Sequence, residues 1–178
     1  MCSRLSLWAS GLTRDDIYWR SATSGGRATF RTRQKRSQQA LPELLNQTGD
    51  ISAIDPLGKP LIDAFFIECK SLADLHLRTL IYGGVGETRK YWEEPLKKAR
   101  SYKKELITVA KENFGKEELV LTTKTGWEIL RQARKPNRAF RVRALFPDLG
   151  LYIFFLRDFL TALDYQKLVH VLESRKTS

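Results

Sequence analysis

The chain reads GDISAID at residues 49–55 and, after a turn that contains proline and glycine, LIDAFFIECK at residues 61–70. Apolar and β-branched residues on both sides of such a turn predict two strands that form a hairpin-like pair. Alternate side chains of a strand share a face, so Glu68 and Lys70 project together while their neighbours point the other way. The predicted pair therefore carries a carboxylate, Asp50, where the first strand starts and a Glu-x-Lys triplet where the second strand ends.

Charged side chains beside an apolar strand are normally paired with each other or bind a ligand. Two carboxylates near one lysine are the groups of a divalent-metal hydrolytic site, because oxygen ligands suit a hard cation. Asp50 and Glu68 are the first candidates as ligands. Asp55 is interpreted as a turn residue before Pro56 and Asp63 as an acid at the start of a strand, and both stay open as ligands.

Composition limits the classes of partner. The 178 residues are 42% hydrophobic, enough for one sizeable core, and predict a single domain over residues 1–178. A net charge of +11 and a pI near 9.8 favour a polyanionic partner. Nucleic acid fits best, because no apolar segment is long enough to cross a membrane. Two cysteines and two histidines show no zinc-ligand spacing and indicate a reducing, cytoplasmic setting.

Helices and strands alternate along the rest of the chain, which predicts an α/β fold with a mixed central sheet flanked by helices. Apolar residues recur at three- and four-residue steps over residues 88–112, typical of one amphipathic helix. Besides the two strands quoted above, the expected elements are helices over 4–12, 72–77, 88–112 and 158–173, and strands over 16–20, 119–123, 140–144 and 151–156.

Three short motifs together resemble the PD-(D/E)XK nuclease superfamily, and within it the archaeal Holliday-junction resolvases and related phage proteins. They are Gly49-Asp50, the triplet Glu68-Cys69-Lys70, and the preceding Ser24-Gly25-Gly26, and the resemblance covers residues 15–70. It implies that Asp50 and Glu68 ligate Mg²⁺ or Mn²⁺, with the Cys69 carbonyl as a further oxygen ligand. It also implies that Lys70 positions or polarises the attacking water, and that Ser24 lies on a loop that reaches the scissile phosphate.

The first helix departs from the family pattern. Members usually carry a glutamate there that completes the metal site, whereas no acidic residue precedes Asp15 in this sequence. Three explanations stay open at this point: the chain starts within that helix, Asp15 or Asp16 substitutes for the glutamate, or the site has lost activity.

Basic residues gather in two places that predict contacts with DNA phosphates. The first is residues 27–48, a segment expected to be mobile until an anionic partner docks. The second is the polar face of the helix expected over 88–112. The predicted DNA-binding residues are Arg27, Arg31, Arg33, Lys35, Arg36, Lys97 and Lys104.

The sequence thus predicts a metal-dependent DNA endonuclease with a PD-(D/E)XK core. The resemblance implies branched DNA as substrate and a homodimer, since symmetric cleavage of a four-way junction needs two active sites. The expected setting is the cytoplasm of a bacterium or of a phage-infected host cell. Two alternatives remain: a phage nuclease that acts on another DNA substrate, and a DNA-binding protein of the same fold with little or no catalytic activity.

Overall fold

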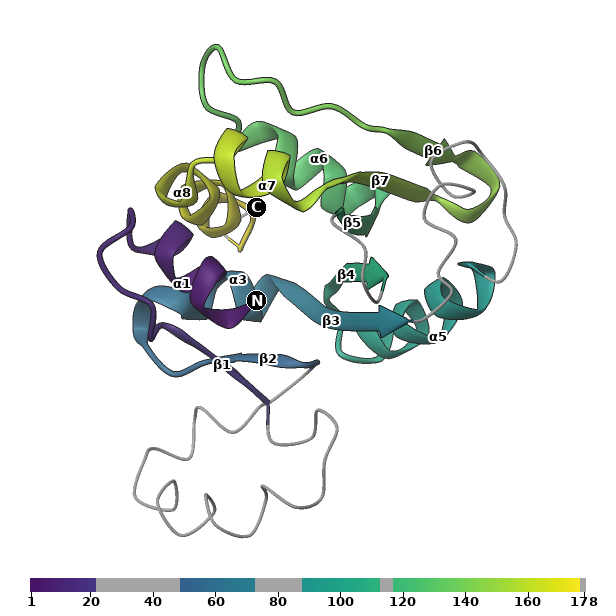
Figure 1. The fold of residues 1–178 in the computed structure, drawn as a ribbon, viewed down its shortest axis with the longest axis horizontal. Coiled ribbons are helices and arrows are strands. Elements are labelled where there is room, and N and C mark those ends of the chain that lie inside the picture. Colours follow the sequence, from purple (N-terminus) through teal and green to yellow (C-terminus); the bar gives the residue numbers. More distant parts are fainter. Residues whose placement is uncertain (22–48, 73–87, 113–116, 177–178) are drawn as a thin grey trace, which may run out of the picture. The chain divides into compact units, whose positions relative to one another are not determined.

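A computed structural model describes residues 1–21, 49–72, 88–112 and 117–176 (Figure 1). The chain divides into two compact units, Met1–Ile62 and Asp63–Ser178. The described elements of the first unit are helix α1 (Cys2–Ala9), strands β1 (Tyr18–Arg20) and β2 (Ile51–Ala53), and the short helix η2 (Pro56–Gly58). Helix α3 (Lys59–Ala64) contains the boundary between the units.

In the first unit, β1 and β2 pair antiparallel, with Tyr18 opposite Ala53. The Ser6 hydroxyl of α1 accepts a hydrogen bond from the backbone N–H of Tyr18 at 2.9 Å, which ties the helix to β1. Gly58, the last residue of η2, lies close to strand β1. A Cβ atom there would lie 2.8 Å from the Tyr18 ring, so only glycine allows this close approach.

The expected hairpin across residues 56–60 is wrong. Strand β2 pairs with β1, and the segment that follows it is helical from Pro56 to Ala64. The helical start has local causes: the Asp55 carboxylate caps η2 by accepting the Leu57 N–H at 2.8 Å, and proline is well tolerated in a first helical turn. The strand expected from Leu61 therefore begins only at Phe65.

The second unit is built on a mixed five-stranded sheet with the order β3-β4-β5-β7-β6. Strands β3 (Phe65–Leu72) and β4 (Glu105–Glu112) are parallel and are joined through helix α5 (Thr88–Ser101), while the other neighbours are antiparallel. The remaining elements are β5 (Glu118–Thr123), α6 (Lys124–Gln132), β6 (Ala144–Phe146), η3 (Pro147–Leu149), β7 (Leu151–Phe155), α7 (Leu156–Ala162) and α8 (Tyr165–Lys176). The predicted α/β class with a mixed sheet and flanking helices is confirmed.

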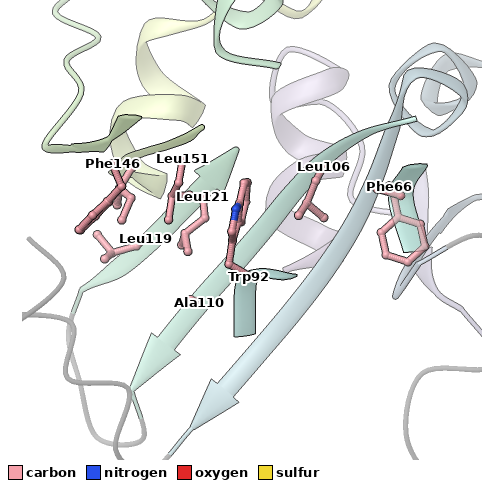
Figure 2. Packing of buried hydrophobic residues seen from close by; sticks show 10 residues of the cluster. Phe66, Trp92, Leu106, Ala110, Leu119, Leu121, Phe146 and Leu151 are labelled. Carbon is pink, nitrogen blue, oxygen red and sulfur yellow. The ribbon is translucent and has the colours of Figure 1, made fainter. Parts of the chain in front are cut away.

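One face of this sheet forms a hydrophobic cluster with α5 (Figure 2). Trp92 of α5 is 1% exposed and packs with Leu106, Ala110 and Leu121 of the sheet. Its indole N–H donates to the carbonyl of Leu149 at 3.2 Å. On the opposite face, α6 places Trp127 against Tyr152 and Phe154, which alternate along β7 with residues that face α5.

Three boundaries differ from the expectation. Residues 88–112 form helix α5 and strand β4 instead of one helix, because a residue such as Leu106 that fits the helical spacing also fits an alternating strand. The closing helix is two helices, α7 and α8, separated at Leu163, which bridges to Arg134. The strand expected over 140–144 starts only at Ala144. The predictions for β5, β7, β1 and α1 are confirmed within a few residues.

The helix expected over 72–77 extends beyond the described residues. Among the residues that the structure describes, no helix has both the length and the apolar character needed to cross a membrane.

Candidate functional site

The Glu68–Lys70 pair of β3 is the centre of the candidate site. The Lys70 ammonium Nζ lies 2.6 Å from Oε1 of Glu68, so the predicted placement of both side chains on one face is confirmed. Parallel pairing with β4 sets Thr108 beside Glu68 and Ala110 beside Lys70. In the described part of the second unit, β3 is at the edge of the sheet, so the pair is at the margin of the apolar face that packs on α5.

The surroundings of Glu68 are largely apolar. The residue is 8% exposed, and Phe66 and Ala110 of the same face belong to the buried cluster. Removing a carboxylate from water is costly, and an ion pair seldom recovers the whole cost. Lys70 is the single partner of the Glu68 carboxylate within the described residues, which leaves oxygen lone pairs available to another ligand.

Thr108 is a polar residue that the sequence reasoning missed. It is 1% exposed, and its hydroxyl is the one buried side-chain donor or acceptor without a hydrogen-bond partner in the described ranges. An unsatisfied buried hydroxyl is costly, and such groups are often found at functional sites. No sequence signal identified Thr108, because residues 88–112 were expected to form one helix, and only the register of β3 and β4 places it beside Glu68.

Helix α5 adds further charges to this side of the unit. Glu94 and Lys98 form an ion pair of 2.9 Å at the helix surface. The hydrogen bond from Lys98 lowers the pKa of Glu94, and the positive charge of Lys70 lowers it slightly further. Lys97, a predicted DNA contact, is exposed on α5, whereas the second predicted contact, Lys104, is half-buried just before β4.

Asp50 belongs to the first unit, whereas Glu68, Cys69 and Lys70 belong to the second. It follows Gly49, whose φ of 85° is a conformation that favours glycine, and directly precedes β2. Its backbone carbonyl accepts the Ser21 N–H at 2.8 Å. Asp50 is half-buried in this turn, and its role as a metal ligand stays a prediction.

The competing acids have structural partners. Asp55 caps η2 through Leu57 N–H and contacts Arg14 Nη1 at 2.7 Å, and these two interactions lower its pKa. The interpretation of Asp55 as a turn residue is thereby confirmed. Asp16 accepts from Arg14 Nε at 2.9 Å, which lowers the pKa of Asp16. Asp63 is in helix α3 and not at a strand start.

Ser24 and the basic cluster of the predicted mobile segment are outside the described residues, so their predicted roles stay predictions. These residues are Arg27, Arg31, Arg33, Lys35 and Arg36.

A hard divalent cation would need several oxygen ligands. The Glu68 carboxylate and the backbone carbonyl of Cys69 have the right chemistry, and the unpaired hydroxyl of Thr108 shows that the same face has unused polar capacity. Within residues 1–21, 49–72, 88–112 and 117–176, no group of three or more histidine, cysteine, aspartate or glutamate side chains is placed to hold a metal ion. Comparisons of the chain with protein-family models, with curated proteins and with solved structures found no match.

Proposed function

We propose that this chain is a metal-dependent DNA endonuclease of the PD-(D/E)XK type that cuts branched DNA as a homodimer in the cytoplasm. The observation that supports it best is the Glu68–Lys70 pair, 2.6 Å apart on a largely apolar sheet face. A strand that keeps a carboxylate and an ammonium in such a place gains little stability from them. Chemistry is therefore the better explanation of the pair.

In this proposal the candidate residues have different roles in phosphodiester hydrolysis. The family resemblance implies Asp50, Glu68 and the Cys69 carbonyl as ligands of Mg²⁺ or Mn²⁺, and such a metal would supply charge neutralisation and an activated water at neutral pH. Lys70 orients the attacking water and adds a compact positive charge beside the phosphate. Water adds to phosphorus while one P–O bond breaks, which leaves a phosphate on one product and a hydroxyl on the other. The Thr108 hydroxyl is available to an oxygen that enters beside Glu68.

The direct test is incubation with a labelled four-way junction and a matched duplex, with and without Mg²⁺. We expect cleavage of the junction only with metal. The Glu68→Gln variant keeps the side-chain shape but loses a charged ligand, and its rate should fall about 1000-fold, the effect of several kcal/mol. The same exchange at the exposed Glu94, Glu94→Gln, is the matched control and should stay within about twofold of the parent rate.

Other outcomes of this experiment would each support a different conclusion. Equal cleavage of duplex and junction indicates a nuclease with another DNA substrate. Binding without cleavage at any Mg²⁺ or Mn²⁺ concentration indicates the non-catalytic DNA-binding alternative. A Glu68→Gln variant that cuts at the parent rate contradicts the assigned site. Light scattering of the protein in solution tests the proposed dimer.

A further inference from the structure

Residues 133–143 connect α6 to β6 (Figure 1). Together with the last two residues of α6 they make up the segment 131–143, which we call the arginine arm. Its sequence, RQARKPNRAFRVR, has six basic residues and no acidic one. By contrast α5, where the sequence predicted DNA contacts, mixes Glu93 and Glu94 with its basic residues. The arginine arm is therefore a segment whose charged residues all have the same sign.

The backbone of the arm is tied to the unit at several points. The Lys135 N–H donates to the Ala162 carbonyl at 2.8 Å, and the Arg143 N–H to the Ile153 carbonyl at 2.7 Å. Between these points Phe140 is 7% exposed, with its ring centroid 4.7 Å from that of Trp127 and 4.8 Å from that of Phe154. The arm is thus held in place by its aromatic anchor, and a partner would bind it without first ordering the backbone.

Most basic residues of the arm are exposed, in contrast to the buried Phe140. Arg131, Arg134, Arg138 and Arg141 are exposed, and within the described residues none of these guanidinium groups has a hydrogen bond or an ion pair. Arg143 differs, because it lies over the Phe155 ring at 4.7 Å and approaches Asp158 at 3.6 Å. Unpaired like charges repel one another, so a polyanion that binds four of them at once relieves this repulsion.

We infer that the arginine arm binds the sugar–phosphate backbone of nucleic acid. Guanidinium groups bind phosphate oxygens in a two-pronged geometry, and contacts repeated along an extended segment suit a chain of phosphates. A membrane surface fits less well, because membrane-binding segments insert large apolar side chains. Phe140 is the arm's one large apolar side chain, and it is buried.

The inference rests on the proposed function for the kind of nucleic acid, which we take to be DNA. Its test measures binding of the full chain to a labelled four-way junction in EDTA over a range of salt concentrations, so cleavage plays no part. In the triple variant Arg134→Ala, Arg138→Ala, Arg141→Ala we expect affinity at about 0.1 M salt to fall at least tenfold. The slope of log affinity against log salt should flatten by about 2 to 3, near one unit for each lost contact.

Two control variants make the test specific. The triple Lys111→Ala, Lys124→Ala, Arg175→Ala removes the same charge from exposed residues scattered over the unit and should change the slope by less than about one unit. The triple exchange of the arm arginines for lysine keeps the charge and should keep most of the slope. Circular dichroism and thermal unfolding check that every variant is folded.

The inference is overturned if the arm variant binds DNA with the parent affinity and slope, or if the scattered control loses as much as the arm variant. It is also overturned if the arm variant keeps DNA binding but loses binding to phosphatidylserine vesicles. Loss of slope in the arm variant of a protein that never cuts DNA would support the arm while contradicting the proposed nuclease. Efficient cutting of DNA by the parent, together with an unchanged slope in the arm variant, would support the proposed nuclease and contradict the role of the arm.

Discussion

Two glutamate–lysine pairs of the second unit have the same chemistry and different surroundings. Glu94 and Lys98 are 2.9 Å apart on the surface of α5, with side chains 71% and 51% exposed. Glu68 and Lys70 are 2.6 Å apart on β3, with side chains 11% and 30% exposed. The first pair joins positions i and i+4 of a helix, and the second joins positions i and i+2 of a strand.

The difference shows which pair is explained by its position on the surface and which pair needs another explanation. An exposed helical pair stays hydrated and contributes little to stability, but it also costs little. The pair on β3 gives up hydration for a position beside a hydrophobic cluster, where apolar side chains of similar size would serve stability as well. We therefore attribute Glu94–Lys98 to the helix surface and Glu68–Lys70 to function, and three measurements test that contrast.

The largest expected effect on stability comes from breaking the strand pair on one side only. Lys70→Met leaves the Glu68 carboxylate uncompensated and should lower the free energy of unfolding by about 1–3 kcal/mol, less than for a fully buried pair because Lys70 remains partly hydrated. Adding Glu68→Leu should bring stability back to within about 1 kcal/mol of the parent. Urea unfolding measures all three proteins, and Lys98→Met is the control on α5.

Restored stability in the double variant, together with loss of cleavage, would separate function from folding at this pair. A double variant as unstable as Lys70→Met alone would instead show that the pair is structural. If Lys98→Met destabilised the protein as much as Lys70→Met, burial would not distinguish the two pairs.

A smaller effect on stability is expected at the Thr108 hydroxyl, which lies beside Glu68. Thr108→Val replaces an unsatisfied buried hydroxyl with a methyl group of similar size and should raise the free energy of unfolding by about 1 kcal/mol. If the hydroxyl serves the site, the cleavage rate should fall in the same variant, a trade of activity for stability. Thr122→Val is the matched control, because the Thr122 hydroxyl donates to the Leu106 carbonyl at 2.6 Å and its loss should destabilise. A Thr108→Val protein that is both less stable and fully active would contradict this view.

The smallest effect is expected at the exposed Glu94–Lys98 pair, in its response to low pH. The pKa of Glu94 is lowered in the folded chain, chiefly by the hydrogen bond from Lys98. The pair therefore adds stability above the unfolded-state pKa of Glu94 and loses it as the pH falls through the lowered folded-state value. Between about pH 5 and pH 3 the melting temperature of Glu94→Gln should fall slightly less than that of the parent. Added salt should shrink the difference, and curves that stay parallel at low salt would contradict the assignment.

Local sequence patterns were sufficient for several features. Period-two alternation placed Glu68 and Lys70 on one face of a strand, and proline after Asp55 indicated the turn that this aspartate caps. Short apolar runs located β5 and β7. These predictions succeeded because strand alternation and turn chemistry depend on residues within a few positions of each other.

Long-range pairing decided the rest. Thr108 is beside Glu68 because β3 and β4 are parallel in one particular register, which no local pattern records. Leu106 satisfied a helical and a strand period equally, and its place in β4 follows from packing against Trp92 of α5. In the same way Phe140 suggested a strand by alternation, but its ring is buried against Trp127 and strand β6 begins only at Ala144. The sequence alone determined the chemical groups and their local spacing, whereas burial and strand register, which sum contacts between distant segments, determined which of those groups meet.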